Sequence, residues 1–482
     1  MKTNSIKVNF IMNIILTMSS FIFPLITFPY VSHILQPIGM GKVSFATSLI
    51  SYFSMLAQLG IPTYGIRVCA QIRDDREQLT RAAHELICIN LLTNLLSYLL
   101  LVLCVLFIPR LREDRNLYLL LSITIILTSV GMEWIYKALE QYKYIAIRSI
   151  IFKFIALILM FVFIHKQSDY LKYAIITIFA ASASNILNLL NIHKFIDFRI
   201  VGNYNIKKHI KPIIVFFSMT CATTIYTNLD SVMLGFMKSD VDVGYYNAAV
   251  KIKYILVAIV TSLGTVLLPR ASYYIEKGNN NEFIRITKKA LTFVITLATP
   301  LMMYFIIFAK ECILFLAGNQ YGGAIIPMKI IMPTVLLIGI SNLLGIQILV
   351  PLGNEQVLLK AEIVGALVDI IINLLLIPKY GATGAAIGTL VAEGVVAYIC
   401  YVALKTHIKN MFKEISYKKI FIALLFAVVS SFWIKYIRIN YLGMLFFSSI
   451  IFGLVYGVML FIMKDDIVVE IINIIKNQLK RL

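Results

Sequence analysis

The sequence is poor in charged residues, and this alone excludes a single soluble domain. Of its 482 residues, 14% are charged and 60% are hydrophobic, whereas an average soluble protein has about 25% charged and about 45–50% apolar residues. Because a protein core does not absorb such an excess, lipid must be the solvent for much of the chain. A transmembrane span needs about 20 apolar residues, so fourteen spans leave no room for a separate soluble catalytic domain.

Signatures of metal, disulfide and nucleotide chemistry are also lacking. The six cysteines include no C-x-x-C pair, and the six histidines are dispersed along the chain, so we expect neither a disulfide framework nor a metal site. The sequence has no G-x-x-x-x-G-K-[ST] stretch, which argues against ATP hydrolysis by this chain. We therefore predict no enzyme activity and no cofactor, and we expect an ion gradient, a substrate gradient or a partner to supply energy.

The net charge of +20 belongs to a membrane protein rather than to a nucleic-acid-binding one. The basic residues lie between apolar runs and not on one domain, as the positive-inside rule expects of loops near an anionic cytoplasmic leaflet. Their distribution predicts that both termini are cytoplasmic. Arg110, Arg112 and Arg115 are the main exception, because they fall in a loop on the opposite side.

The apolar runs predict an all-α polytopic protein with fourteen transmembrane helices. Helices are required because a spanning segment must satisfy its own backbone hydrogen bonds. The first run follows only two lysines and is too long for a cleaved signal sequence, so we expect it to be retained. The runs fall near residues 8–34, 43–66, 84–108, 117–136, 144–165, 171–192, 212–236, 244–268, 288–309, 328–350, 357–377, 383–404, 419–436 and 441–463. Residues 464–482 have apolar positions at helical spacing, which predicts an amphipathic helix at the cytoplasmic interface.

An internal repeat indicates two parallel halves. Gly41 and Gly244 each open a helix after a short turn, 203 residues apart, and the same offset relates Arg67 to Arg270. The repeat predicts an N-terminal six-helix lobe (1–200) and a C-terminal six-helix lobe (201–410) related by a pseudo-twofold axis, followed by helices 13 and 14 (411–463). Such duplication is typical of transporters whose binding site lies between the halves.

Five segments carry a resemblance to a known family. They are Phe23–Arg67, Met132–Lys153, Asp230–Ile252, Leu267–Ser272 and Pro378–Glu393. In these segments the chain resembles polysaccharide flippases of the Wzx type, in the multidrug/oligosaccharidyl-lipid/polysaccharide exporter superfamily. The resemblance implies two lobes around a central cavity that move a polyprenyl-pyrophosphate-linked oligosaccharide from the inner to the outer leaflet, for O-antigen or capsule synthesis. It also implies that the protein lies in the inner membrane of a bacterium. The partners that it implies are membrane lipid and a polymerase and chain-length complex.

Cationic side chains at membrane depth are candidates for binding the anionic substrate. A charged side chain near the bilayer centre costs about 2.5–3.5 kcal/mol, so it normally faces water or a partner. Lysine and arginine suit a pyrophosphate through charge-assisted hydrogen bonds. The candidates for the substrate cavity are Lys153, Arg148, Lys251, Arg67 and Arg270. The alternative is that such charges pair with each other and lock helices together, or that the arginines extend to the interface.

Acidic side chains at membrane depth are candidates for ion coupling. Asp369 and Glu393 fall near the middle of their spans, and Asp230 lies in the outer third of another. Each carboxylate could take up the H⁺ or Na⁺ that resets a transporter, or could instead serve a structural ion pair. Gly384 and Gly388 form a small-xxx-small pattern, for which we expect close helix packing.

Three other functions fit part of this pattern. A membrane glycan polymerase or ligase resembles a multi-span chain with a long external loop, but the longest external connection here, near 309–328, is short. A multidrug exporter of the same superfamily would need an apolar or acidic cavity for cationic drugs. A peptidoglycan lipid-precursor flippase shares the two-lobe plan and an anionic lipid substrate.

Overall fold

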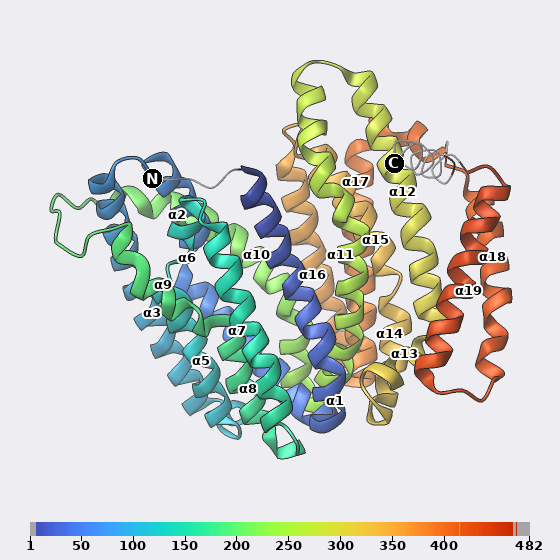
Figure 1. Cartoon of the computed structure of the whole chain (residues 1–482), viewed down its shortest axis with the longest axis horizontal. Helices are drawn as coiled ribbons and strands as arrows, with labels where there is room; N and C mark the ends of the chain where they lie inside the picture. Colours follow the sequence, from blue (N-terminus) through green and yellow to red (C-terminus); the bar gives the residue numbers. More distant parts are fainter. Residues whose placement is uncertain (1–5, 414, 466–468, 470–482) are drawn as a thin grey trace. The chain divides into compact units, whose positions relative to one another are not determined.

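The computed structural model describes residues 6–413, 415–465 and 469. Every regular element in this part of the chain is helical (Figure 1), and the chain divides into two compact units, Met1–Gly244 and Tyr245–Leu482. Twelve helices of the described residues are long and apolar enough to cross a membrane, or thirteen if the bent pair Asn319–Ile331 and Thr334–Leu349 is one span. The chain is therefore an all-helical, multi-pass membrane protein. Most of the predicted helix at 464–482 lies outside the described residues.

Among its described residues, the first unit contains ten α-helices, two 3-10 helices (η1 and η3) and one π-helix (η2). It also contains the first residues of α11, which starts at Asp240. The complete elements are α1 (Ile6–Gln58), α2 (Ile61–Gln71), α3 (Arg76–Phe107), α4 (Pro109–Arg112), α5 (Arg115–Val130), α6 (Glu133–Ala138), α7 (Tyr142–Phe163), η1 (Gln167–Asp169), α8 (Tyr170–Ile178), η2 (Phe179–Ala183), α9 (Asn185–Asn191), η3 (Ile192–Lys194) and α10 (Lys207–Met237).

The helix α1 joins the first two predicted spans. Its 53 residues would extend about 80 Å at 1.5 Å per residue, far more than the hydrocarbon thickness of about 30 Å. Gln36 interrupts it with φ 58° and ψ 178°, and Pro37 restarts the helix, a place that suits proline because the first helical N–H has no partner inside the helix. The loop expected between residues 34 and 43 is thus a break at a single residue.

The second predicted span is divided rather than continuous. Leu59 (φ 45°) and Gly60 (φ 74°) adopt left-handed conformations between α1 and α2. A Cβ atom on Gly60 would lie 2.5 Å from the backbone nitrogen of Phe217 in α10, so the turn needs glycine for both its conformation and its close packing. The prediction of one continuous helix over 43–66 is therefore wrong near its end. The turn contains only Leu59, which packs partly buried against the apolar core, and Gly60, so it does not interrupt the apolar pattern of the sequence.

The core of the first unit holds α2, α3 and α6 together. Leu79, Ile135 and Tyr136 are fully buried in one apolar cluster, and a Cβ atom on Gly65 would lie 2.6 Å from the ring of Trp134. The Tyr136 hydroxyl donates a hydrogen bond of 2.7 Å to the Asn188 carbonyl. Short helices that do not span the membrane by themselves are fixed in this way.

The seventh predicted span, α10, belongs to the first compact unit. It packs against α1 and α2, and the unit ends after Gly244. The sequence predicts a boundary between two repeats after residue 200. This boundary differs from the end of the compact unit at Gly244, and the repeat itself stays a prediction.

The second unit starts within α11 and continues to the C-terminus. Its elements are α11 (Asp240–Glu276), α12 (Asn280–Ile307), α13 (Ala309–Leu316), η4 (Asn319–Ala324), α14 (Ile325–Ile331), α15 (Thr334–Asn342), η5 (Leu343–Leu349), α16 (Glu355–Tyr380), α17 (Ala382–Lys413), α18 (Tyr417–Phe432), η6 (Trp433–Tyr436) and α19 (Tyr441–Ile462). An apolar cluster that includes Leu291, Leu344 and Cys400 forms its core.

Two glycines bring α16 and α17 into close contact. A Cβ atom on Gly384 would lie 2.6 Å from the carbonyl carbon of Leu376, and one on Gly388 would lie 2.7 Å from the Oδ1 atom of Asp369. The packing role predicted for this pair of glycines is confirmed.

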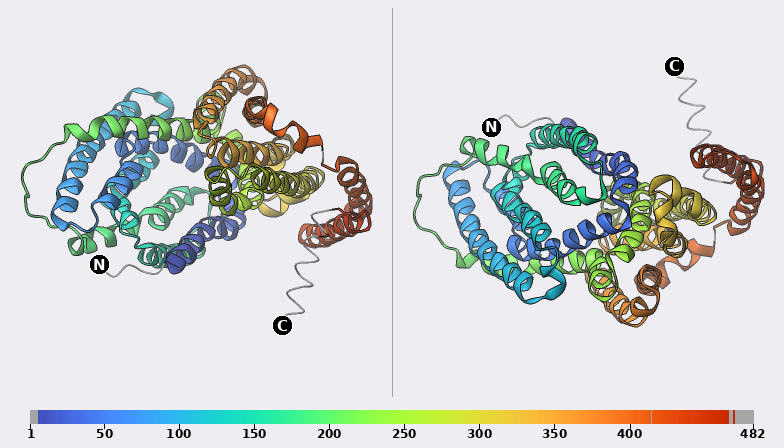
Figure 2. Two further views of the ribbon diagram at one scale, coloured as in Figure 1. Left: turned by 90° about the horizontal axis from the view of Figure 1, so that it is seen from above. Right: turned by 90° about the horizontal axis from the view of Figure 1, so that it is seen from below.

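The helices α18 and α19 run side by side and lie against α12 and α13 (Figures 1 and 2). Two tyrosines attach α19 to α12: the Tyr304 hydroxyl donates to the Leu445 carbonyl at 3.0 Å, and the Tyr456 hydroxyl donates to the Thr296 carbonyl at 2.9 Å. Lys435 adds an ion pair with Glu311 at 3.6 Å. The predicted helices 13 and 14 therefore correspond to α18 and α19, a hairpin that polar contacts attach to the other helices of the second unit.

Candidate functional site

Lys153 is the predicted cavity residue with the most distinctive environment. It lies on α7, half-buried, and its Nζ atom donates hydrogen bonds to the hydroxyls of Ser19 (3.0 Å) and Ser20 (2.9 Å) on α1. Within the described residues its ammonium group forms no ion pair with a carboxylate. The hydroxyls orient the ammonium group without neutralising it, so its charge remains available to an anion.

Arg148 has a different environment, although it lies only five residues before Lys153. It is 4% exposed, and its Nη2 atom donates to Glu133 at 2.6 Å. Its Nη1 atom donates to the side chains of Ser184 and Asn185, both at 3.0 Å. These bonds join α6, α7 and the start of α9, an arrangement that fits the alternative of a helix-locking ion pair.

The other three predicted cationic residues are distributed over both units. Arg67 on α2 and Arg270 on α11 have exposed side chains, and Lys251 on α11 is half-buried. Lys253, two residues further along α11, is 5% exposed. The two lysines thus differ in burial, as their separation of about 200° around a helix leads one to expect.

The three predicted acidic residues are all buried. Asp369 on α16 is 2% exposed, Glu393 on α17 is 7% exposed, and Asp230 on α10 is 7% exposed. The Asn373 side chain, also buried, donates to Asp369 Oδ1 at 3.2 Å. Asp369 therefore lies in the α16–α17 contact beside Gly388, in a polar environment enclosed by helices.

A stripe of polar residues on α3, which we did not predict, holds the segment between α9 and α10. Arg76 forms an ion pair with Asp197 at 2.7 Å, Thr80 accepts a hydrogen bond from the Asp197 amide at 3.2 Å, and His84 contacts the Asp197 carbonyl at 2.9 Å. We call Arg76, Thr80, His84 and Glu85 the connector clamp. The hydrogen-bonded Arg76 guanidinium holds the pKa of Asp197 below its usual range. Arg76, Thr80 and His84 are four residues apart in the first turns of α3, and this spacing is the signal that could have identified the stripe.

Glu85 is the buried centre of the connector clamp. Its side chain is 0% exposed, and it accepts hydrogen bonds from the Asn205 amide (2.6 Å), from Lys208 Nζ (2.8 Å) and from His209 Nε2 (2.7 Å). The other ring nitrogen of His209 contacts the Tyr64 hydroxyl at 2.8 Å. The start of α10 is thereby fixed to α2 and α3.

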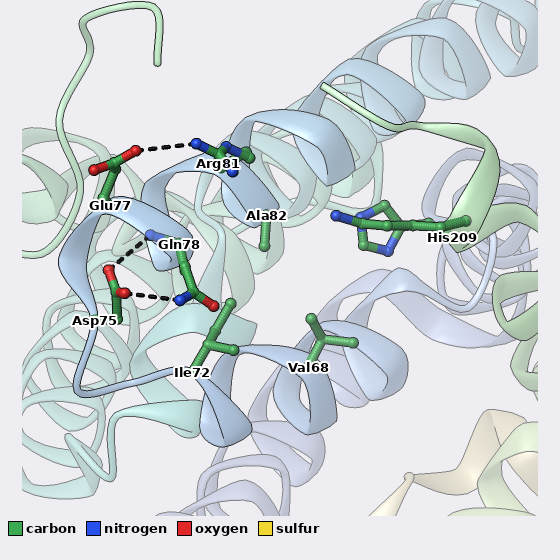
Figure 3. A pocket seen from close by; sticks show the side chains of 9 residues that line it. Val68, Ile72, Asp75, Glu77, Gln78, Arg81, Ala82 and His209 are labelled. Carbon is green, nitrogen blue, oxygen red and sulfur yellow. Dashed lines mark hydrogen bonds and ion pairs between the residues drawn. The ribbon is translucent and has the colours of Figure 1, made fainter. Parts of the chain in front are cut away.

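A pocket of 390 Å³ opens beside this cluster (Figure 3). Val68, Ile72 and Ala82 supply its apolar wall, and its basic residues Arg81 and Lys208 pair with Glu77 and Glu85. None of the eight predicted site residues lines it. Because its charges are already paired within the unit, the pocket lacks the chemistry expected of a pyrophosphate site.

The structure has close relatives in fold among transporters. A lipid II flippase, MurJ, in an inward closed conformation superposes with a TM-score of 0.74 at 18% identity, covering 95% of this chain and 100% of that chain. An inward-facing multidrug-resistance transporter of the MATE family, in the MOP superfamily, superposes with a TM-score of 0.61 at 12% identity, covering 81% of this chain and 95% of that chain. The likeness shows the fold.

Sequence comparison extends the likeness to polysaccharide export. A protein of Escherichia coli (strain K12) named "Putative O-antigen transporter" is 22% identical over 400 residues, which cover 82% of this chain and 95% of that protein. Residues 214–375 match the MatE family. Residues 6–275, more than half of the chain, match the family described as polysaccharide biosynthesis protein. The chain therefore belongs to the polysaccharide biosynthesis protein family.

Proposed function

We propose that this protein is a secondary transporter that flips a polyprenyl-pyrophosphate-linked oligosaccharide repeat unit from the cytoplasmic to the outer leaflet of the bacterial inner membrane. In this proposal α1 counts as two spans, which with the bent pair gives fourteen, and both termini are cytoplasmic. The repeat forms two six-helix lobes, and the sugar headgroup crosses through a hydrated cationic cavity while the polyprenyl tail stays in lipid. The E. coli relative and the matched family support the substrate class.

The environment of Lys153 carries the proposal. Its ammonium group is held at span depth by two hydroxyls and forms no ion pair within the described residues. A cation kept without a carboxylate in an apolar span has a cost, which a passing pyrophosphate would offset through charge-assisted hydrogen bonds. Lys251, Arg67 and Arg270 would extend this cationic path, whereas Arg148 would position α7 through its pair with Glu133.

The buried carboxylates would couple transport to an ion. Asp369, with the Asn373 amide beside it, offers oxygen ligands, which suit Na⁺, and a carboxylate that can also take up H⁺. Glu393 and Asp230 are further candidates at similar burial. Replacement of H⁺ by Na⁺ gradients in membrane vesicles would identify the coupling ion, and Asp369→Asn should remove the dependence.

Substitution of Lys153 tests the substrate path. Lys153→Ala should reduce surface polysaccharide about tenfold or more, because one charge-assisted hydrogen bond is worth about 1.5–3 kcal/mol, and Lys153→Arg should retain part of the export. The measurement is surface polysaccharide in a strain whose own copy of this gene is deleted, with membrane abundance of each variant measured in parallel. Lys172→Ala, which removes an exposed lysine, is the control. Unchanged export by Lys153→Ala would contradict the proposal.

A peptidoglycan lipid-precursor flippase is the second candidate, favoured by the superposition with lipid II flippase. Both functions need a cationic path for a pyrophosphate, so Lys153 does not separate them. Rescue of cells depleted of their lipid II flippase by this chain would favour the second candidate. Loss of surface polysaccharide without a growth defect, on deletion of the gene, would favour the first.

A further inference from the structure

The pocket beside the connector clamp lies where three candidate spans end. Its residues come from the end of Ile11–Gln71, from the loop after it, and from the first two turns of Arg76–Phe107 and Lys207–Met237. Phospholipid headgroups occupy about 5–8 Å beyond the hydrocarbon core on each side of a bilayer. The volume of 390 Å³ is within the range of about 300–1,000 Å³ of small-molecule sites. The pocket therefore has the depth and the size of a headgroup site.

Asp75 gives the pocket an acidic side. Its carboxylate accepts a hydrogen bond from the Gln78 amide at 3.0 Å on one oxygen and from the Gln78 side chain at 2.8 Å on the other. Each carboxylate oxygen has a second lone pair, so the group can also accept bonds from an ammonium ion. The hydrogen bond from the Gln78 amide holds the pKa of Asp75 below its usual range, and the charge of Arg81 acts in the same direction. Asp75 is therefore ionised at neutral pH.

Lys208 gives the pocket a basic side. Its Nζ atom pairs with Glu85 at 2.8 Å, and its side chain is 46% exposed. An ammonium group has three N–H donors, so two remain for a ligand. His209, the next residue along the chain, lies across the pocket from Asp75 (Figure 3). The two signs of charge are thus presented from different sides of one pocket.

Arg81 supplies a second set of donors. Its guanidinium donates to Glu77 at 3.0 Å, and its Nε atom is buried without a hydrogen-bond partner among the described residues. A surface pair of this i,i+4 kind contributes little stability, so an anion can share the guanidinium at small cost. A buried N–H without an acceptor costs free energy. The site therefore favours a ligand that brings phosphate oxygens.

A ligand that satisfies both sides carries a phosphate and a primary ammonium on one headgroup. A quaternary ammonium has no N–H donor for Asp75 and is normally held by aromatic rings. None of the nine described residues that line the pocket is Phe, Trp or Tyr. A glycerol headgroup brings no cation, and free phosphate leaves the Asp75 carboxylate without a partner. The charges therefore select an ethanolamine phosphate over choline, glycerol or inorganic phosphate.

We propose that this pocket binds the headgroup of phosphatidylethanolamine, with the ammonium on Asp75 and the phosphate on Arg81 and Lys208. The lipid comes from the leaflet at this end of the spans, which the loop charges predict to be the cytoplasmic one. The apolar wall with Val68 and Ile72 faces the glycerol end of the lipid. A seated headgroup joins α3 to the start of α10, so bound lipid stabilises the first unit by mass action.

A titration with a short-chain lipid tests this inference. The delipidated full chain in detergent is titrated with dihexanoylphosphatidylethanolamine, and native mass spectrometry counts the bound lipid. We expect one lipid per chain, bound about tenfold more tightly than dihexanoylphosphatidylcholine or dihexanoylphosphatidylglycerol, because those lipids lack the charge-assisted hydrogen bond to Asp75. The unfolding midpoint of the chain should rise with the same order of lipids.

Matched variants test the residues. Asp75→Asn should weaken binding of dihexanoylphosphatidylethanolamine about tenfold, because it removes the charge from that hydrogen bond. Asparagine caps a helix as well as aspartate does, so α3 keeps its start. Asp74→Asn is the control, because Asp74 is an exposed carboxylate of the same loop that does not line the pocket, and its affinity should be unchanged. Arg81→Gln should show a similar loss from the phosphate side.

The outcomes separate the site from other lipid binding and from export. Equal affinity of Asp75→Asn and the unmodified chain for dihexanoylphosphatidylethanolamine would overturn the site. Equal affinity for dihexanoylphosphatidylglycerol would also overturn it, because a purely anionic lipid would then suffice. Binding of water-soluble glycerophosphoethanolamine as tightly as the lipid would overturn the membrane as the source of the headgroup. These measurements do not use export, so their failure is distinct from a failure of the proposed function.

Discussion

At the scale of single residues, neighbouring charges on one helix have different surroundings. Arg148 is buried against Glu133, Ser184 and Asn185, whereas Lys153 meets two hydroxyls. The sequence placed Lys153 near mid-depth and Arg148 nearer the cytoplasmic end, because depth follows from position along an apolar run, and it proposed both for the cavity. It did not distinguish their surroundings, because their partners come from segments up to 134 residues away and no local pattern encodes that proximity.

Glu85 provides a residue-scale test of the connector clamp. Glu85→Ala should lower the free energy of unfolding by about 3–5 kcal/mol, since removing one partner of a buried charge network leaves the others unsatisfied. Glu77→Ala on the same helix is the control, because its exposed i,i+4 pair with Arg81 is worth about 0.3–0.5 kcal/mol. Thermal unfolding of both variants in detergent measures the difference. Equal midpoints would show that the Glu85 contacts do not stabilise the fold.

Asp197 predicts a dependence of stability on pH. Its pKa is lowered in the folded chain by its hydrogen bond to Arg76, so it favours folding above its unfolded pKa of about 3.9. That contribution is lost as the pH falls through the lower, folded pKa. Arg76→Gln should therefore lose less stability than the unmodified chain on acidification, by a small margin because both side chains are exposed. An equal loss of stability on acidification in Arg76→Gln and in the unmodified chain would contradict this prediction.

At the scale of helices, the apolar pattern predicted where spans lie but not how they are interrupted. The runs near 8–34 and 43–66 appear as one helix, α1, with a break at Gln36, and the turn at Gly60 divides the second run. The hydropathy of a segment depends on how apolar its residues are and not on their backbone conformation. One or two residues in a left-handed conformation therefore leave no mark in the hydropathy pattern. The Gly384 and Gly388 contact was predictable because small residues four apart lie on one face.

The glycine contact between α16 and α17 gives an element-scale prediction. Gly384→Ala should destabilise the second unit by about 1–3 kcal/mol, because the new Cβ atom would lie 2.6 Å from the Leu376 backbone. Gly394→Ala, on the same helix with no atom within 4 Å, should be neutral or slightly stabilising, since alanine favours helix. Thermal unfolding in detergent compares the two variants. A loss of stability confined to Gly394→Ala would contradict the packing.

At the scale of the whole molecule, composition and apolar runs predicted an all-helical, multi-pass membrane protein, which the structure confirms. The resemblance predicted a family of polysaccharide flippases, and the match of residues 6–275 shows the polysaccharide biosynthesis protein family. The sequence repeat did not show that α10 packs with the first compact unit. That placement depends on the connector clamp and on Gly60 against Phe217, which are contacts between segments distant in sequence. The predicted repeat compares two segments of the sequence, whereas the packing of α10 depends on which surfaces meet in the folded chain.

The proposed transport of a polyprenyl-pyrophosphate-linked oligosaccharide across the bilayer can be measured with purified components. The most direct measurement reconstitutes the purified full chain in liposomes with a labelled lipid-linked oligosaccharide and follows the sugar that becomes accessible to a membrane-impermeant glycosidase. We expect transfer with the unmodified chain and a reduction of about tenfold or more with Lys153→Ala, from the loss of one charge-assisted hydrogen bond. A rate equal to that of protein-free liposomes, with the chain correctly inserted and an ion gradient applied, would contradict the claim.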